Sequence, residues 1–175
     1  MSLVKILSQE MENNYNVTRK LFLLVEPGQL CWKPPTGSNW MTVGQLLMHC
    51  SSACGVAVRA FVTDDWGLPD GIDMKDIPPE EMLPPAEKLP AVESVEQALR
   101  LLEEDREVGR AALAGVAEAD LLNRRFAAPW GGAELTLFQH ALHMIEHLAQ
   151  HKGQLYYYLK MLGKDIKTPD LWGEV

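Results

Sequence analysis

Four of the five histidines in this 175-residue sequence lie within residues 140–151, and three of them recur at every fourth position. His143, His147 and His151 project from one face if the segment is helical, because residues four apart lie one above the other. Histidine pairs at this spacing are typical of metal sites built from two adjacent helical turns. A single histidine on an apolar face is more often a packed core residue, but several buried imidazoles would need several hydrogen-bond partners. The pattern therefore favours metal binding.

One ion can contact only two of these three histidines. His143 and His151 are about 12 Å apart along a helix axis at ~1.5 Å per residue. Metal–nitrogen bonds of ~2.1 Å do not bridge that distance. The spacing allows His143 with His147 or His147 with His151, and the remaining histidine would line the pocket or support a ligand. His140 lies about 60° off the stripe and is the weakest candidate.

A third ligand is available in the fifth histidine, His49, which lies in an earlier predicted helix. Gln45, Leu46, Ser52 and Ala53 share its helical face and leave room beside the ring. Metal ligands drawn from two facing helices recur in helix bundles. Three neutral histidines leave coordination positions open for water or substrate, which is typical of catalytic sites, and histidine-only sites suit zinc, nickel, copper and iron. The ion could lower the pKa of a bound water or thiol, or polarise a carbonyl.

The elements that must position these residues are helices, because apolar residues recur at helical spacing in four stretches. Thr42, Ser94 and Thr136 each have Gln three residues later, a capping box at the start of three of them. The predicted helices cover about residues 3–25, 42–62, 94–115 and 136–163. Only short ambiguous pieces resemble strands. A short helical turn and a bend are expected over residues 120–129, followed by a tight turn at residues 130–132.

This order of elements predicts an all-α fold, a four-helix bundle in one domain over residues 1–175. Residues 64–90 are rich in proline, glycine and acidic side chains and form a long crossover between the second and third helices. A plain surface linker is the favoured interpretation of that loop, with a lid over the site as the alternative. Residues 164–175 are expected to form an irregular tail.

Composition excludes several classes of function. The net charge is −8 and no run of lysine and arginine occurs, which argues against nucleic-acid and anionic-lipid partners. No apolar run approaches the ~20 residues that span a bilayer, and no signal peptide is evident, so a soluble, cytoplasmic protein is expected. Three cysteines without a C-x-x-C pattern argue against disulfides, and Cys50 and Cys54 are expected to be buried. Nucleotide-binding and α/β-hydrolase motifs are missing from the sequence.

Two segments resemble the DinB family of metalloenzymes, also called DinB/YfiT-like. One is His151-Lys152-Gly153-Gln154 preceded by His147, where the family has a His-x-x-x-His pair ending in a His-Arg-Gly-Gln-like sequence; Lys152 replaces the arginine. The other is the stretch from Trp40 to His49, which resembles the family's entry into its second helix. The two segments lie towards opposite ends of the chain, and the proline-rich middle matches no motif.

The resemblance implies an up-down-down-up four-helix bundle that binds a divalent metal, often nickel or zinc, through His49, His147 and His151. His143 matches a position that is frequently histidine but lies outside the triad. Gln154 would orient a ligand or a bound water, or else pack within its helix. The wider superfamily includes S-transferases that use bacillithiol, mycothiol or glutathione, and mycothiol-dependent maleylpyruvate isomerases.

The leading hypothesis is therefore a metal-dependent thiol S-transferase that acts on a small electrophile with a low-molecular-weight thiol. A non-catalytic metal-binding module for stress response or dimerisation is the first alternative, and a metal-dependent hydrolase is the second. Tyr156, Tyr157 and Tyr158 are consecutive, so a helix must expose at least one of them, which suggests a homodimer surface.

Overall fold

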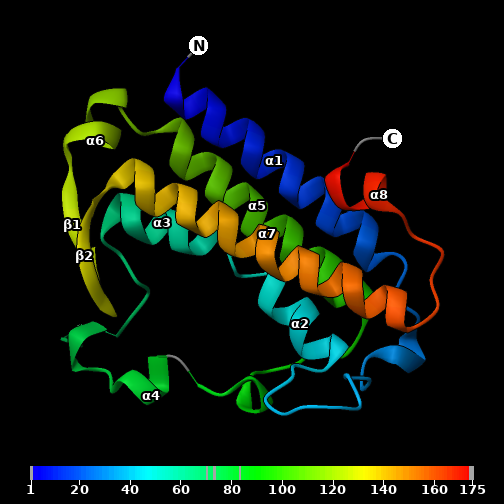
Figure 1. Cartoon of the computed structure of the whole chain (residues 1–175). Coiled ribbons are helices and arrows are strands. Elements are labelled where there is room, and N and C mark those ends of the chain that lie inside the picture. Colours follow the sequence, from blue (N-terminus) through cyan, green and yellow to red (C-terminus); the bar gives the residue numbers. More distant parts are fainter. Residues whose placement is uncertain (1, 70, 73, 83, 174–175) are drawn as a thin grey trace.

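The chain is mostly helical (Figure 1). The computed structural model describes residues 2–69, 71–72, 74–82 and 84–173, so parts of the predicted loop and tail lie outside the described residues. The α-helices are α1 (Leu3–Phe22), α2 (Val43–Cys50), α3 (Gly55–Thr63), α4 (Pro79–Met82), α5 (Val95–Ala114), α6 (Glu118–Asn123), α7 (Leu137–Met161) and α8 (Thr168–Trp172). Short 3₁₀ turns cover Pro27–Gln29, Met74–Asp76 and Ala86–Lys88, and the strands are β1 (Arg125–Ala128) and β2 (Gly131–Thr136).

The long helices begin where the sequence predicts. The hydroxyls of Thr42 and Thr136 each accept a hydrogen bond from the backbone N–H three residues later. The backbone N–H of each threonine donates to the side-chain oxygen of the glutamine at that position, so both capping boxes are formed. Ser94 caps α5 in the same way through its hydroxyl. These bonds satisfy donors that a helix start otherwise leaves free. The predicted helix starts are therefore confirmed at these three residues.

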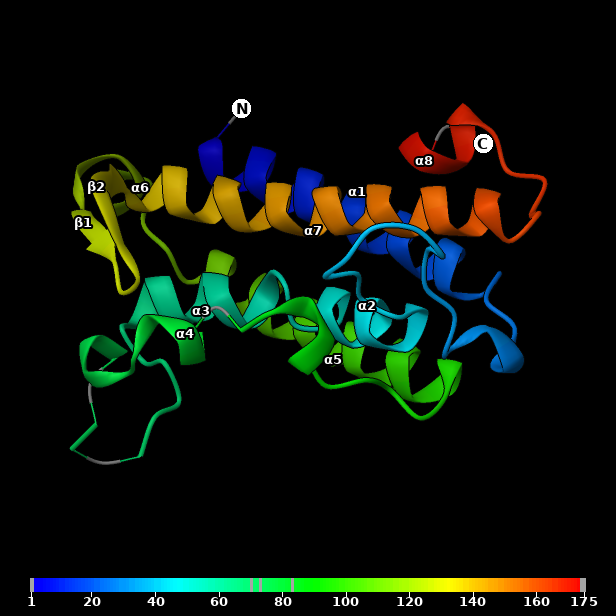
Figure 2. The same cartoon turned by 60° about the horizontal axis from the view of Figure 1, so that its bottom comes forward.

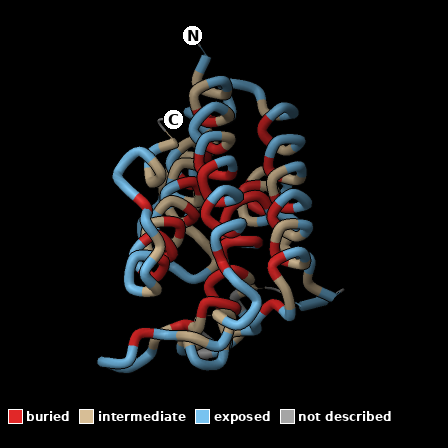
Figure 3. The backbone as a smooth tube through the Cα atoms, turned by 90° about the vertical axis from the view of Figure 1, so that its right-hand side faces the viewer, coloured by how far each residue is buried: buried red, intermediate tan, exposed pale blue. Residues whose placement is uncertain are grey.

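Amphipathic packing arranges the helices into one core. In α1 the buried side chains recur every third or fourth residue and include Leu7, Met11, Tyr15 and Thr18. That face packs against α5 and α7, while α2 and α3 follow one another along the same two helices (Figures 1 and 2). The buried segments face inward between the helices, whereas the loops are mostly exposed (Figure 3). Removing apolar side chains from water in this way is the main force that holds such helices together.

One continuous helix over residues 42–62 is predicted, and this is wrong. The helix ends at Cys50 and a new one begins at Gly55, with residues 51–54 between them. The whole stretch Val43–Thr63 is long and apolar enough to cross a bilayer by length and composition, contrary to the sequence expectation. In the fold it is interrupted, more than half buried, and packed on α5 and α7, which accounts for its apolar character.

Three irregular regions contain more structure than predicted. Residues 125–136 form an antiparallel hairpin with Phe126 opposite Leu135 and a bulge after Phe126, whereas no strand is predicted there. The turn between the strands lies at residues 129–130 and overlaps the predicted tight turn only at Trp130. Gly131 and Gly132, which begin β2, both have positive φ angles that favour glycine. The loop over residues 64–90 contains α4 and two 3₁₀ turns, and the tail contains the short helix α8 instead of being irregular throughout.

Candidate metal centre

The structure brings three of the predicted histidines together across the core. His49 comes from the last turn of α2, and His147 and His151 come from adjacent turns of α7. The Nε2 atom of His49 lies 3.1 Å from Nε2 of His147 and 3.1 Å from Nε2 of His151. One ligand atom from each residue lies within 4.8 Å of the others, and this is the one group of metal-binding side chains found in the described part of the chain.

In His147 and His151, the ring nitrogen that points away from the cluster, Nδ1, has a hydrogen-bond partner. His147 donates from Nδ1 to the carbonyl oxygen of Ala53, in the break between α2 and α3, at 3.2 Å. His151 donates from Nδ1 to Oε1 of Gln154 at 3.1 Å. Gln154 in turn donates to the hydroxyl of Tyr158, which donates to the carbonyl of Met41. Because a neutral imidazole carries one N–H, both Nε2 atoms present lone pairs to the centre.

Burial keeps the three imidazoles neutral. It lowers the pKa of His49 to about 4, with smaller contributions from His151 and His147. Burial also lowers the pKa of His147 and of His151, although the hydrogen bonds that they donate to Ala53 and Gln154 oppose the shift. A neutral imidazole is the form that binds metals, so these groups are in the binding form at neutral pH.

The geometry fits a shared cation. Two nitrogens that each lie ~2.1 Å from one ion are about 3.0–3.4 Å apart when the angle between the bonds is near 90–110°. The separations of 3.1 Å lie in that range. His49 has one proton to donate, so at least one of its two contacts sets lone pair against lone pair. A positive ion held by the three Nε2 atoms would replace this repulsion with ligand bonds.

A small cavity of about 120 Å³ adjoins His49. Met48, Ser52, Leu89 and Pro90 complete its lining, so the walls are mostly apolar and Ser52 contributes a hydroxyl. Its size allows a few solvent molecules or the reactive end of a small substrate beside the imidazole of His49.

The other residues singled out from the sequence have different positions. Gln45 is bonded to the backbone of Thr42, Glu87 and Leu89, so it closes the capping box and anchors the end of the 64–90 loop. Its connection to the site is indirect, through Leu89 in the cavity wall. His143 is exposed on α7.

His140 is a core residue. Its ring is stacked between Phe61 and Phe126, and its Nε2 donates to the Phe126 carbonyl at 2.9 Å. Cys50 and Cys54 are buried, as predicted, and burial raises the pKa of the Cys54 thiol to about 12. Neither cysteine belongs to the group of metal-binding side chains.

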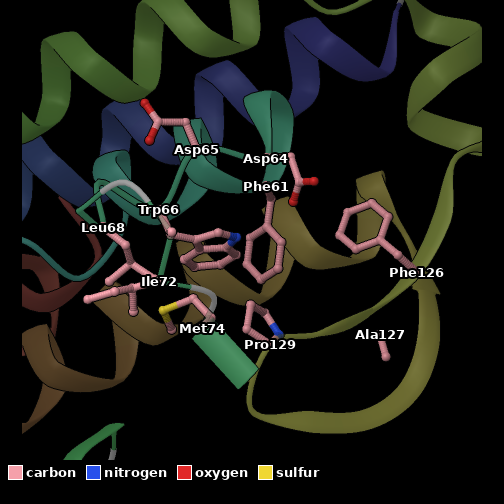
Figure 4. A pocket seen from close by; sticks show the side chains of 11 residues that line it. Phe61, Asp64, Asp65, Trp66, Leu68, Ile72, Met74, Phe126, Ala127 and Pro129 are labelled. Carbon is pink, nitrogen blue, oxygen red and sulfur yellow. The ribbon is translucent and has the colours of Figure 1, made fainter. Parts of the chain in front are cut away.

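A larger cavity of about 560 Å³ lies elsewhere, between the C-terminal end of α3, the following loop and the hairpin (Figure 4). Phe61, Trp66 and Phe126 form aromatic walls, and Asp64 and Asp65 are its charged lining residues. The lining contains none of the three clustered histidines. The candidate site is therefore identified by its three metal-binding side chains and not by the size of the cavity beside it.

Sequence reasoning missed two partners of the histidines. The Ala53 carbonyl is available because the helix breaks, and backbone groups leave no mark in a sequence pattern. Tyr158 completes the chain of hydrogen bonds from His151, and its position four residues after Gln154 on the same helix is a signal that could have been used.

Comparison with known proteins agrees with the geometry. The model of the DinB superfamily matches residues 10–155, which include all three clustered histidines and most of the helical core. Among curated proteins, none matches the chain. The match covers well over half of the sequence, and the chain belongs to the DinB superfamily.

Proposed function

We propose that the protein is a metal-dependent thiol S-transferase whose site is formed by His49, His147 and His151. The observation that carries the proposal is the convergence of three Nε2 atoms while Ala53 and Gln154 hold the outer nitrogens of two of the rings. Nickel or zinc suits an all-histidine site and is our proposed cofactor. Among the residues that the structure describes, only three side chains converge as ligands, so a position remains for a substrate atom.

The residues of the site have separate tasks. The three imidazoles would hold the ion, and a divalent ion bound there would lower the pKa of a coordinated thiol. Ala53 and Gln154 keep His147 and His151 in the tautomer that presents Nε2. In the transfer itself, the thiol sulfur bonds to the electrophilic carbon, the leaving group departs with its bonding electrons, and the thiol proton passes to solvent. The apolar wall of Met48, Leu89 and Pro90 limits water around the reacting atoms.

Turnover with defined thiols tests this function. Protein stripped of metal and reloaded with Ni²⁺ or Zn²⁺ is incubated with glutathione, bacillithiol or mycothiol and monobromobimane, and the S-conjugate is measured. We expect conjugate formation above the uncatalysed rate, its loss in His147→Ala, and its retention in His143→Ala, which changes an exposed histidine of the same helix. Metal binding without turnover with any thiol would favour the non-catalytic module. Oxygen from ¹⁸O-labelled water in a product would favour the hydrolase.

The proposed setting is a four-helix bundle in the cytoplasm, in which α2 and α3 together take the place of the second helix and residues 64–90 form the crossover. The family match and the packing of α2 and α3 on α5 and α7 support the bundle. Free thiols at Cys31, Cys50 and Cys54 support a reducing compartment.

We also propose a homodimer through the outer face of α7. Tyr156 and Tyr158 are buried, whereas Tyr157 is 63% exposed and Met161, one turn later, is 54% exposed. Exposed aromatic and methionine side chains are typical of interfaces. Sedimentation should show a dimer that Tyr157→Ser with Met161→Ser converts to a monomer; a wild-type monomer would refute this assignment.

A further inference from the structure

The break between α2 and α3 is held by a side chain from another helix. In an unbroken helix the N–H groups of Gly55 and Val56 would donate to the carbonyls of Ser51 and Ser52, four residues back. Here Gly55 N donates to Oδ2 of Asp105 at 2.9 Å, and Val56 N donates to Oδ1 at 2.7 Å. Asp105, on α5, therefore replaces the carbonyls that the break removes and acts as the N-terminal cap of α3.

Asp105 is itself fixed in the core. It is 3% exposed, and the hydroxyl of Tyr15 on α1 donates to its Oδ2 at 2.6 Å. Gly55 N also lies 2.9 Å from the Tyr15 hydroxyl oxygen. A carboxylate at a helix N-terminus is favoured by the helix dipole, and buried polar groups that are fully bonded hold one arrangement. The cap thus ties α1, α3 and α5 together at one point.

Close backbone packing leaves the first turn of α3 little freedom. A Cβ atom on Gly55 would lie 1.7 Å from the carbonyl oxygen of Asp105, and a Cβ atom on Gly109 would lie 2.8 Å from Cα of Gly55. Only glycine allows this approach of α3 to α5. The residues immediately before Gly55 are therefore held in place with respect to α5.

The carbonyl that supports His147 lies in this held segment. Among the described hydrogen bonds, no backbone N–H donates to the carbonyl of Ala53, so it is free to accept from His147 Nδ1. His151 is supported separately by Gln154, on its own helix. We infer that Asp105 is a positioning residue of the metal centre. By capping α3 it maintains the break that presents the Ala53 carbonyl to His147, and so it selects the tautomer of His147. The tautomer of His151 does not depend on Asp105. The role of Asp105 in metal binding rests on the proposed function.

The tautomers can be read in the metal-free protein by long-range ¹H–¹⁵N NMR of the imidazole nitrogens. In the wild type we expect His147 and His151 both to carry the proton on Nδ1. Asp105→Asn places an NH₂ group against N–H donors, so we expect His147 to populate both tautomers while His151 is unchanged. Gln154→Ala should give the opposite result. Tyr15→Phe, which keeps the carboxylate but removes one of its bonds, should give a weaker form of the Asp105→Asn result and serves if that variant does not fold.

A core substitution separates positioning from general loss of stability. Leu113→Ala removes a fully buried side chain of α5, two turns beyond Asp105, and should lower the melting temperature without changing either tautomer. Affinity for Zn²⁺, measured with a competing chelator, should fall about tenfold in Asp105→Asn, as for other groups that orient ligands, and remain within about twofold in Leu113→Ala. The inference is overturned if His147 is unchanged in Asp105→Asn, if both histidines change together, or if Leu113→Ala has the same effect. A wild type that binds no metal but shows the tautomer pattern would reject only the proposed function.

Discussion

The two sides of the histidine cluster are built in opposite ways. α7 is unbroken over 25 residues, and its regular rise places His147 and His151 on adjacent turns. The opposite side is a helix that stops at Cys50 and restarts at Gly55. The regular helix supplies the ligand spacing, whereas the interruption supplies the carbonyl of Ala53 as a hydrogen-bond acceptor for His147. The site therefore depends both on the helical periodicity of α7 and on the interruption between α2 and α3.

The largest effect is expected when a side chain is forced into the break between α2 and α3. Gly55→Ala adds a Cβ atom that would lie 1.7 Å from a backbone oxygen of Asp105, which no side-chain rotation relieves. Because α3 must move away from α5, we expect a loss of about 3 kcal/mol in the free energy of unfolding, measured with urea. Metal affinity should fall as well. An unchanged midpoint of urea unfolding would show that α3 can move away from α5 without loss of stability.

Acid should act on the cluster in the metal-free protein. The folded-state pKa of His49 is about 4, below the ordinary 6.5, and those of His147 and His151 are also lowered. A lowered histidine pKa means that the unfolded chain binds protons that the folded chain does not. The contribution of these groups to stability is therefore complete above pH 6.5 and is lost as the pH falls towards 4.

Urea unfolding at several pH values checks this dependence. His49→Phe should flatten the pH profile between 6.5 and 4, whereas His143→Gln, at an exposed position of α7, should leave its shape unchanged. An identical profile in His49→Phe would mean that other groups cause the acid sensitivity.

Changes at the helix starts should have a smaller effect on stability, and the effect should be similar for α2 and α7. Thr42 and Thr136 form equivalent capping boxes at the beginning of α2 and α7. Alanine at either position should cost about 1 kcal/mol of stability, because each change removes one capping acceptor. Similar losses of stability from the two variants in thermal unfolding would show that α2 and α7 differ in the break after α2 and not in how they begin. A much larger loss for one variant would show that the two helix starts differ.

The smallest effect is expected in the regular helix. Gly153 lies in α7 between His151 and Leu155, and a Cβ atom there would meet nothing within 4 Å. Gly153→Ala should stabilise the protein by about 0.5–1 kcal/mol, since alanine loses less backbone freedom on folding. A gain in stability here, beside the loss in Gly55→Ala, would show that α7 tolerates a side chain where the first turn of α3 does not. Destabilisation would show that α7 is also tightly constrained.

The regular features were accessible from sequence because they depend on local spacing. The capping residues and the apolar periodicity located the long helices, and four-residue spacing placed His147 beside His151. The choice of that pair over His143 with His147 came from family resemblance, because the periodicity is the same for both. The structure agrees that His143 is outside the cluster.

The irregular features depend on distant residues. The apolar pattern continues through residues 51–54, so local sequence predicts one helix, while the groups that stabilise the break, Asp105 and Tyr15, lie on α5 and α1. Gln45 has the right type and helical face for the site, but its amide is bonded to the end of the 64–90 loop. The hairpin over residues 125–136 was missed because β1 has only four residues, and because β2 is exposed over its first four residues and shows no alternation.

Elemental analysis of purified protein shows whether His49, His147 and His151 share one cation. After loading with Ni²⁺ or Zn²⁺ and removal of excess metal, the wild type and His143→Ala should each retain about one ion per chain. His49→Ala and His147→Ala should retain almost none, while circular dichroism shows that they remain helical. Equal metal content in His49→Ala and the wild type, or no retained metal in a folded wild type, would contradict the account.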